Sequence, residues 1–391
     1  MEKLHPIIFL KALFDSYDFS PWYQCIRYKK QVLFSAKPFL KTADVMIIKD
    51  IPDYLSLEQS TNKAYTWLKV KTLKGHSIQV EQYQTLEEYL LENFSAKSRS
   101  NLRRYTKRLE TCFNIRYVCY WGSIPKDEYD VLFKALKKLL IKRFAQKKEV
   151  NYELQHLDNF EAEIYAQLQN KEAALYVIYH HQEPISIRIN MIKKNLCFYM
   201  MSAYDIDYAK FHLGSIDMMK NIAWCIQQNM LKYDLLKGYD YYKKNWMTQS
   251  FDYYNHIIYN HKNTKARLYA NYLKLKTKLL YLGYYNLKKI NADLYYKSLK
   301  QGWYTLSAQT NKENKLVLID ALPFEPSSGV EIKLMQGEKY KHLKKNIFDF
   351  LFSSQQSLDE IKLYKAKETL DHFQVIGKKT SYAFIVKTRK Q

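Results

Sequence analysis

Residues 174–246 contain three short apolar runs in succession: ALYVIY (174–179), ISIRINMI (185–192) and LCFYMM (196–201). β-Branched and aromatic residues dominate each run, and such residues are enriched in strands. Only a few polar residues separate the runs, among them Glu183 and Pro184 in the first turn and Asn195 in the second. The stretch therefore predicts a three-stranded meander.

A loop, a helix and a further strand follow the meander. The loop closes at residues 212–215, and the apolar side chains of residues 219–230 then recur close to the helical period. Residues 233–236 form one more apolar run, which ends before Gly238. The first N–H groups of a helix are unpaired and lie at the positive end of its dipole, so this helix start is a candidate anion site. A plain loop-to-helix junction would explain the same residues.

Four segments carry a resemblance to a known family: FSAKSRSNLRR (94–104), EPIS (183–186), LGS (213–215) and DLLKGYDYYKKNW (234–246). Together they resemble the GNAT superfamily, in the branch with the CelD-like proteins and the Fem-type aminoacyltransferases. The resemblance implies a mixed α/β (α+β) fold with a GNAT-type sheet flanked by helices, in tandem GNAT-like halves. It implies acyl transfer without a covalent enzyme intermediate. The loop has one Gly where typical coenzyme A binders have two, which leaves the identity of the acyl donor open.

The resemblance implies that two segments of the chain bind the acyl donor, which would be acetyl-CoA or another acyl-CoA. The family places carbonyl-binding backbone amides at the end of the third meander strand, here around Met201 and Ser202. The cofactor pyrophosphate would lie on the loop before the helix, at His212, Leu213, Gly214 and Ser215. His212 is also a candidate base, and a surface histidine is the alternative.

Three residues on and after the last strand are the catalytic candidates. Asp234 would deprotonate or orient an amine or hydroxyl acceptor, and a structural carboxylate is the alternative. The resemblance makes Tyr242 the proton donor to the leaving group and Lys243 an electrostatic partner.

Cationic residues supply the candidate contacts to the substrate. Residues 97–110 predict a basic helix, capped by Ser95 or Ser98, in which Arg103 and Arg104 would bind a phosphate. A solvated face beside a packed stripe is the alternative. On the second meander strand Arg188 would hold an anionic acceptor or project outward from the sheet. Tyr204, after the third strand, is a further candidate contact to the substrate.

Composition limits the classes of protein that remain. The chain has 391 residues, is 47% hydrophobic and has a formal charge of +23, which favours a folded protein with anionic partners over a disordered chain. Biased codon usage is an alternative source of the many lysines. The five scattered cysteines show no zinc-like spacing, so we expect no metal site and a reducing, cytoplasmic environment. No apolar run is long enough to span a membrane, and the first residues do not resemble a signal peptide.

The chain divides into four predicted parts. Residues 1–120 would be a degenerate GNAT-like half with the basic helix, and residues 121–260 the acyltransferase domain. Residues 261–301 would be a basic helical linker, for which a face binding nucleic acid or a membrane surface is the alternative. Residues 302–391 would form a C-terminal α/β unit, a further GNAT-like half or a separate cap.

The expected function is an N- or O-acyltransferase that uses acyl-CoA and acts on a small or envelope-related molecule, such as a glycan precursor. A Fem-type reaction would replace acyl-CoA with aminoacyl-tRNA, and the basic surface would then bind the tRNA. A non-catalytic adaptor that binds nucleic acid or a membrane surface is the remaining alternative.

Overall fold

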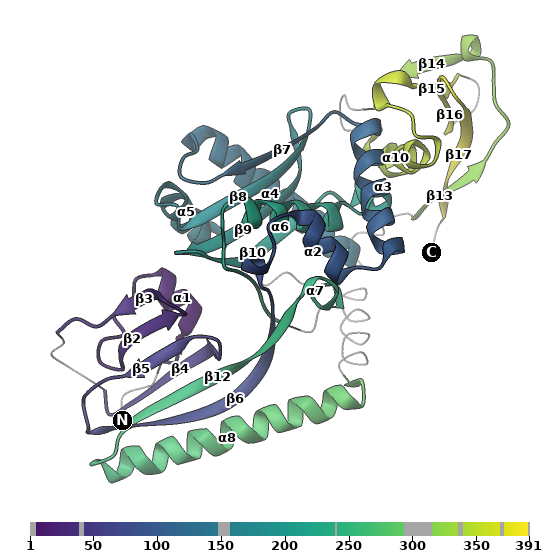
Figure 1. Ribbon diagram of the computed structural model, residues 1–391. Coiled ribbons are helices and arrows are strands. Elements are labelled where there is room, and N and C mark those ends of the chain that lie inside the picture. The colour runs from purple at the N-terminus through teal and green to yellow at the C-terminus, as the bar shows by residue number, and fades with distance from the viewer. Residues whose placement is uncertain are drawn as a thin grey trace.

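A computed structural model describes residues 5–38, 43–147, 157–238, 241–292, 315–334, 339–367 and 371–389. Figure 1 shows an elongated molecule in which a long twisted sheet joins an N-terminal part, in purple, to a central part in teal. The C-terminal unit, in yellow, lies at the opposite end from the N-terminal part and next to α3 (Ala96–Cys112). Within these residues no helix is both long and apolar enough to cross a membrane.

The central feature is a mixed sheet of nine strands. From one edge to the other it contains β1 (Ile7–Ile8), β4 (Val45–Pro52), β12 (Gln249–Asn260), β6 (Tyr65–Ile78), β11 (Lys232–Lys237), β10 (Leu196–Tyr204), β9 (Glu183–Lys193), β8 (Ala173–His180) and β7 (Ile115–Tyr120). Strands β8, β9 and β10 confirm the predicted meander. Two pairs are parallel, β1 with β4 and β10 with β11, and the other neighbours are antiparallel.

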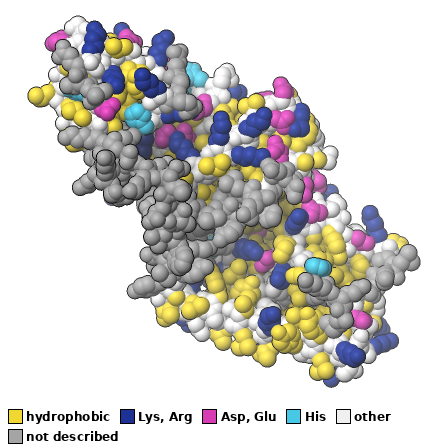
Figure 2. All heavy atoms as spheres, turned by 180° about the vertical axis from the view of Figure 1, so that it is seen from behind, with side chains coloured by type: hydrophobic (Ala, Val, Ile, Leu, Met, Phe, Trp, Pro, Cys, Tyr) yellow, Lys and Arg dark blue, Asp and Glu magenta, His cyan; other side chains and the backbone are white. Residues whose placement is uncertain are grey.

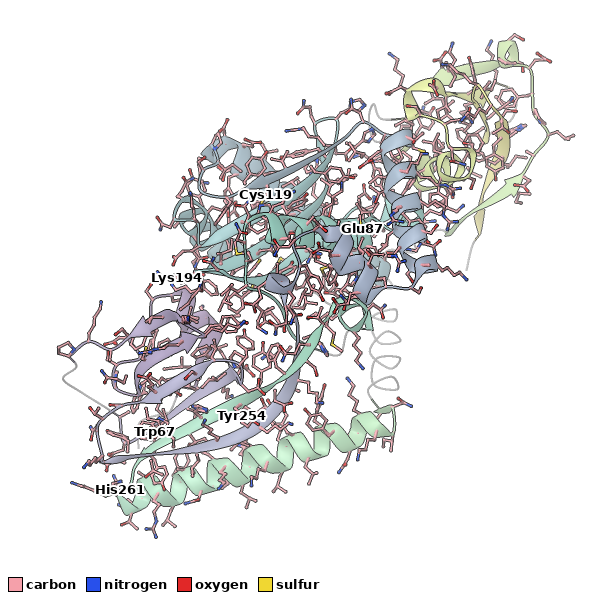
Figure 3. All side chains as sticks on the ribbon, viewed as in Figure 1. Trp67, Glu87, Cys119, Lys194, Tyr254 and His261 are labelled. Atoms are coloured by element: carbon pink, nitrogen blue, oxygen red, sulfur yellow. The ribbon has the colours of Figure 1, made fainter. Side chains whose placement is uncertain are left out.

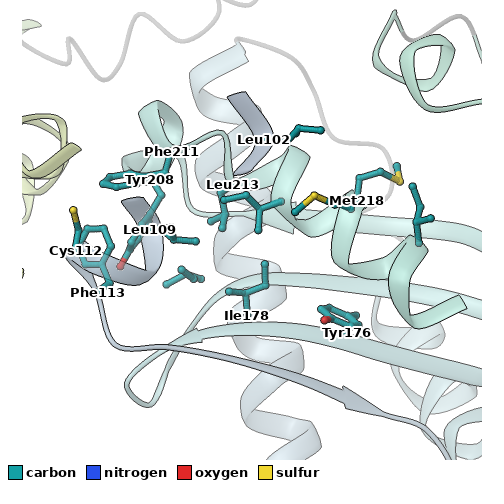
Figure 4. Packing of buried hydrophobic residues seen from close by; sticks show 14 of the residues in the cluster. Leu102, Leu109, Cys112, Phe113, Tyr176, Ile178, Tyr208, Phe211, Leu213 and Met218 are labelled. Carbon is teal, nitrogen blue, oxygen red and sulfur yellow. The ribbon is translucent and has the colours of Figure 1, made fainter. Parts of the chain in front are cut away.

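Helices cover both faces of this sheet, as the mixed α/β prediction requires. On one face lie α2 (Leu86–Asn93), α3 and α6 (Leu213–Gln227), whose apolar side chains share a core with β8 and η3 (Ile206–Phe211). Figure 4 shows this core, with Leu109 and Phe113 beside Tyr208 and Leu213 above the strands. On the other face lie α1 (Phe9–Phe14), α4 (Lys126–Lys147) and α5 (Leu157–Gln169). Burial on both faces explains why β8 is apolar almost throughout. Strand β9 is buried along most of its length as well, but it also carries the buried polar residues Ser186, Arg188 and Asn190.

The N-terminal part completes the central sheet. Strand β6 lies between β11 and β12, and it pairs antiparallel with both. A separate three-stranded sheet, β3 (Gln31–Ser35), β2 (Tyr23–Tyr28) and β5 (Ser56–Gln59), covers α1. A short turn of 3₁₀-helix, η1 (Val80–Gln82), leads from β6 towards α2. Helix α7 (Tyr241–Trp246) precedes β12, and α8 (Thr264–Lys289) follows it along β6 and β12.

The C-terminal unit is an antiparallel sheet with one helix. Its strands, in spatial order, are β13 (Lys315–Asp320), β17 (Ser381–Arg389), β16 (His372–Ile376), β15 (Lys362–Ala366) and β14 (Gly329–Ile332). The 3₁₀ turns η4 (Pro326–Ser328), η5 (Lys341–Leu343) and η6 (Leu358–Glu360) connect them with α10 (Lys344–Ser354). Phe348 of α10 packs on Phe113 and Tyr208, with ring centroids 4.7 and 4.6 Å apart. The unit therefore packs on the loop that leads into α6.

Candidate active site

The central sheet opens between β10 and β11. These parallel strands are in register only from the Leu196–Lys232 pair to the Phe198–Asp234 pair, and β10 continues to Tyr204. A β-bulge interrupts the pairing of β10 with β9 between Tyr199 and Met201. Because a bulge re-aims the residues beyond it, Tyr199, Ser202 and Tyr204 all line one cavity.

The cavity has a volume of about 270 Å³. Its lining comes from the C-terminal end of α4, from β9 and β10, from η3 and the start of α6, and from α7. The residues are Arg143, Gln146, Arg188, Tyr199, Ser202, Tyr204, Ile206, Ala209, His212, Leu213, Gly214, Ser215, Tyr242 and Trp246. Both polar and aromatic side chains therefore surround the space that the separating strands leave.

A buried ion pair forms one wall of the cavity. Arg188 Nε donates to Asp217 Oδ2 at 2.8 Å, and its Nη2 donates to the same carboxylate oxygen. The side chains are 3% and 1% exposed, and the guanidinium lies over the Tyr199 ring at 4.4 Å from the centroid. The charge of Arg188 is thus paired with Asp217 of α6, and its expected role in holding an anionic acceptor stays a prediction.

Hydrogen bonds extend from this pair along the inner face of α6. Arg188 Nη1 donates to Tyr233 Oη at 3.1 Å, and Tyr233 donates to Asn190 Oδ1 at 2.9 Å. Asn190 donates in turn to Asn221 Oδ1, and Asn221 donates to Asp217. This closed polar network ties β9 and β11 to α6, and it satisfies groups that would be costly to bury unpaired.

The start of α6 has unpaired donors at the cavity. No side chain caps the helix, and within the described part of the chain no acceptor is found for the N–H groups of Leu213 and Gly214. His212, before the helix, has left-handed backbone angles (φ 53°). A Cβ atom on Gly214 would lie 2.9 Å from Cε1 of Tyr204. The glycine is therefore required by the close approach of the Tyr204 ring.

Cations and aromatic rings surround this helix start. Arg143 donates to the carbonyl of Ser202 at 3.1 Å, and its guanidinium lies 4.6 Å from the Tyr204 ring centroid. The His212 ring stacks on Tyr105 of α3, with centroids 4.0 Å apart. Burial lowers the pKa of His212, and the nearby charge of Arg104 lowers it further. The positive charge and the free N–H groups make this end of the cavity suited to an anion.

Comparison with known proteins assigns the central part of the chain. Residues 96–244 match the family model described as an acetyltransferase (GNAT) domain. These residues form a GNAT acetyltransferase domain. They contain α3, the meander, α6, β11 and most of α7, and thus nearly every residue of the cavity lining. The chain therefore carries an acyltransferase domain, as the resemblance implied.

Solved structures were also compared with the whole chain. One is FemX, at 10% identity and a TM-score of 0.40, covering 58% of this chain and 75% of FemX. Another is the C-terminal domain of a putative lysylphosphatidylglycerol synthetase from Agrobacterium fabrum, at 8% identity and a TM-score of 0.37, covering 58% and 70%. A third is a tandem GNAT protein of the clavulanic acid pathway, at 9% identity and a TM-score of 0.31, covering 55% and 63%. No curated protein matches the chain.

The GNAT domain brings together eight of the residues that the sequence indicated. They are Arg188, Ser202, Tyr204, His212, Leu213, Gly214, Ser215 and Tyr242, all of which line the cavity. Tyr242 packs edge-on against Tyr199, with centroids 6.5 Å apart. Met201 does not line the cavity and packs on the opposite face of β10, in the core with α4.

The two arginines of the basic helix lie in different environments. Arg103 forms an exposed ion pair with Glu87 of α2, a residue labelled in Figure 3. Arg104 is exposed and lies close enough to His212 to lower its pKa. Neither lines the cavity, and of the two only Arg104 is placed at the start of α6.

Asp234 lies outside the cavity. It is 1% exposed and accepts from Tyr54 Oη at 2.5 Å and from the N–H of Leu236 at 2.7 Å. Side chains alternate along a strand, so it lies on the face of β11 opposite to Tyr233. Burial raises the pKa of Asp234 to about 6. In this position the Asp234 carboxylate does not reach the cavity in which an acceptor would bind.

Two lysines accompany this carboxylate. Lys243 lies near Asp234, donates to the carbonyl of Lys237 at 3.0 Å, and faces the Tyr199 ring at 5.7 Å. Lys232 is buried with its Nζ 4.5 Å from the Tyr54 centroid, and burial lowers its pKa to about 8. Lys243 thus lies between the cavity and the Asp234 cluster.

Three residues of the site carried no sequence motif. Arg143 lies near the end of an amphipathic helix, Tyr199 is one of 36 tyrosines, and Asp217 lies in a mostly apolar helix. The one available indication was that Asp217 is the only acid of α6, because a carboxylate that is buried needs a partner. Within the described residues no group of three or more His, Cys, Asp or Glu side chains could hold a metal ion.

Proposed function

We propose that the chain transfers an acyl group from acyl-CoA to an amine or hydroxyl acceptor at the cavity between β10 and β11. The single observation that supports this most is the position of the uncapped start of α6 at the cavity. It combines unpaired N–H groups at Leu213 and Gly214 with the nearby cations Arg104 and Arg143. A pyrophosphate would accept from those N–H groups and gain from both charges.

The thioester would extend from this anion site towards the bulge of β10. A β-bulge leaves a residue unpaired with the neighbouring strand, here Met200, between the paired Tyr199 and Met201. We assign the contact to the thioester carbonyl to backbone amides at this bulge. Such donors stabilise the negative charge that develops on the carbonyl oxygen during the reaction.

The transfer would proceed in one step. The acceptor nitrogen or oxygen forms a bond to the carbonyl carbon, and the bond between this carbon and the coenzyme sulfur breaks. His212, whose pKa is lowered by burial, would take the proton of the acceptor. Tyr242 would donate a proton to the departing thiolate.

A charged tRNA is the second candidate donor. The exposed face of α3 continues the positive charge beyond the cavity with Lys97, Arg103, Arg104 and Lys107. This face is larger than a pyrophosphate needs, and a nucleic acid backbone would use it. In that case the aminoacyl ester of the tRNA would occupy the cavity in place of the thioester.

Calorimetric titration with acetyl-CoA, beside release of free thiol in the presence of a panel of amines and alcohols, tests the proposal. We expect binding that Gly214→Val weakens and that Gly283→Ala leaves unchanged, because Gly283 has no atom within 4 Å of an added Cβ. Absence of coenzyme A binding, with deacylation of charged tRNA, would instead establish the Fem-type donor. Failure of both donors would remove the catalytic proposal.

A further inference from the structure

Helix α8 carries an apolar stripe that faces solvent. Leu268, Tyr272, Leu275, Leu279 and Leu282 follow one another at spacings of four and three residues, which places them on one side of the helix. Each is more than half exposed, from 56% for Tyr272 to 66% for Leu268. Leu280, Leu287 and Ile290 are exposed as well. Exposed apolar groups of this extent on one element indicate an interaction surface.

The packing of α8 on the protein does not involve this stripe. The buried side of the helix consists of Ala266 and Ala270, which pack with Val70 and Ile257 of the sheet, with Tyr269 and Leu273 beside them. Tyr285 donates to the carbonyl of Thr72 at 2.7 Å. The helix is therefore held by one face, and its leucine stripe is not needed to bury the sheet.

The charge of α8 is entirely positive. The helix contains no Asp or Glu between residues 264 and 289. Its cations are Lys265, Arg267, Lys274, Lys276, Lys278, Lys288 and Lys289. In Figure 2 hydrophobic side chains, in yellow, and Lys and Arg, in dark blue, gather together along the lower edge of the molecule. A helix with an apolar stripe and a strongly basic remainder is typical of binding at a lipid–water interface.

We propose that α8 binds an anionic lipid surface, with the leucine stripe among the acyl chains and the lysines at the headgroups. At about 1.5 Å per residue the helix is about 39 Å long, so several lipids would lie under it. Lysines near a negatively charged leaflet are attracted to it, and the leucines gain by leaving water. The inference does not depend on the acyl donor.

Two other partners fit this surface less well. A second copy of the chain would bring two acid-free helices together, with Lys276 and Lys278 on either side of Leu275 and Leu279 facing their equivalents. Like charges so placed repel one another. A nucleic acid would use the cations, but its phosphates offer nothing to the exposed leucines. Of these three partners, the anionic lipid surface is the one that uses both parts of the helix.

Co-sedimentation of the full chain with vesicles tests the proposal. We expect at least tenfold tighter partitioning to vesicles of phosphatidylglycerol and phosphatidylcholine than to vesicles of phosphatidylcholine alone, and weaker partitioning at high salt. The pair Leu275→Ser and Leu279→Ser should weaken it about tenfold or more. The triple change Lys274→Gln, Lys276→Gln and Lys278→Gln should do the same at low salt.

Matched controls are available on other elements. Leu91→Ser with Val131→Ser removes two exposed apolar residues elsewhere, and Lys134→Gln, Lys138→Gln and Lys194→Gln removes three exposed lysines. Neither control should alter partitioning, and thermal unfolding should show every variant folded. Partitioning that the α8 variants leave unchanged would overturn the proposal. The proposal would also be overturned if the unchanged protein were a dimer that the leucine variant converts to a monomer. It would likewise be overturned if the protein did not bind vesicles but bound RNA, and the α8 variants weakened that RNA binding.

Discussion

Arg188 on β9 and Asp217 on α6 form an ion pair that is almost completely buried, with Nε and Oδ2 2.8 Å apart. The pair lies at the wall of the cavity and fixes the helix whose first N–H groups we assign to the acyl donor. The geometry of the donor site therefore depends on a buried contact between β9 and α6 at the wall of the same cavity.

Asp217→Asn should lower the free energy of unfolding by roughly 3–5 kcal/mol, because it leaves the Arg188 charge buried without its partner. Replacement of both residues, as in Arg188→Met with Asp217→Leu, should recover part of this loss. Urea unfolding monitors both. Asp130→Asn, which removes an exposed pair with Lys126, should change stability by less than about 1 kcal/mol. If Asp217→Asn and Asp130→Asn lowered the free energy of unfolding by similar amounts, burial of the Arg188–Asp217 pair would have no special role.

Gly214→Ala tests the start of α6 with the smallest possible change. The added Cβ would lie 2.9 Å from the Tyr204 ring, so the ring or the helix start must shift, and affinity for acetyl-CoA should fall severalfold. Gly283→Ala on α8 should stabilise the protein by roughly 0.5–1 kcal/mol, since Ala has the higher helix propensity. Titration calorimetry and thermal unfolding distinguish the two effects. Equal donor affinity in the two variants would exclude close packing at Gly214 as a determinant of binding.

Arg104→Ala should raise the Michaelis constant for the donor, whereas Arg103→Ala should not. Arg104 lies close to His212, and Arg103 is engaged with Glu87 at the outer edge. The effect of Arg104→Ala should shrink as salt is added, because exposed charges are screened. Steady-state kinetics over a range of ionic strength measures it. Equal changes for both arginines would point to a diffuse charge effect.

Tyr242→Phe should lower turnover by roughly 10–10²-fold through loss of the proton donor, with little change in stability. Asp234→Asn should affect turnover less and stability more, since this carboxylate contacts Tyr54 and not the cavity. If Asp234 were the catalytic base, Asp234→Asn would instead lower turnover more than Tyr242→Phe. Measurements of turnover and of urea unfolding on both variants test this order. A 10²–10⁴-fold loss of turnover in an Asp234→Asn variant that stays folded would support Asp234 as the catalytic base.

Lys232→Met should stabilise the protein at pH 7. Burial lowers the pKa of Lys232 to about 8, below the ~10.4 of an unfolded chain. The folded state favours the neutral amine, so this stability is present above about pH 10 and is lost as the pH falls through about 8. At pH 7 removal of the charge should contribute up to about 3 kcal/mol, less about 1 kcal/mol for the lost hydrogen bond to Ser77.

The pH dependence of unfolding checks this last prediction. The gain of Lys232→Met over the unchanged protein should diminish between pH 8 and pH 10. Lys194→Met, at an exposed position between β9 and β10, should show no such dependence. A gain that stays constant over this pH range would mean that burial does not lower the pKa of Lys232.

The elements of the GNAT domain were predictable from local patterns. Short runs of β-branched and aromatic residues define β8, β9 and β10, and the apolar period defines α6. Ser95 caps α3 as expected, accepting from the N–H of Ser98 at 3.3 Å. These features depend on residues that are close in sequence, which is why periodicity and capping rules find them.

Several strands and partners could not be found in this way. Strand β6 lies between β11 and β12, which joins residues 65–78 to strands that follow more than 150 positions later. The parallel register of β10 with β11 and the bulge at Tyr199 likewise depend on pairing between separate segments. The division of the chain at residues 120, 260 and 301 stays a prediction. Residues 302–314 of the expected C-terminal α/β unit lie outside the described residues.

The sequence by itself determined the meander, the basic helix, the loop before α6 and most of the cavity lining, because each is a local pattern or a family motif. Only the tertiary structure decided what those residues do to one another. It buried Arg188 against Asp217, directed Asp234 away from the cavity, and placed Arg143 and Tyr199 beside the start of α6. The physical reason is that burial, charge pairing and strand register are properties of contacts, and a chain acquires these contacts only when distant segments meet.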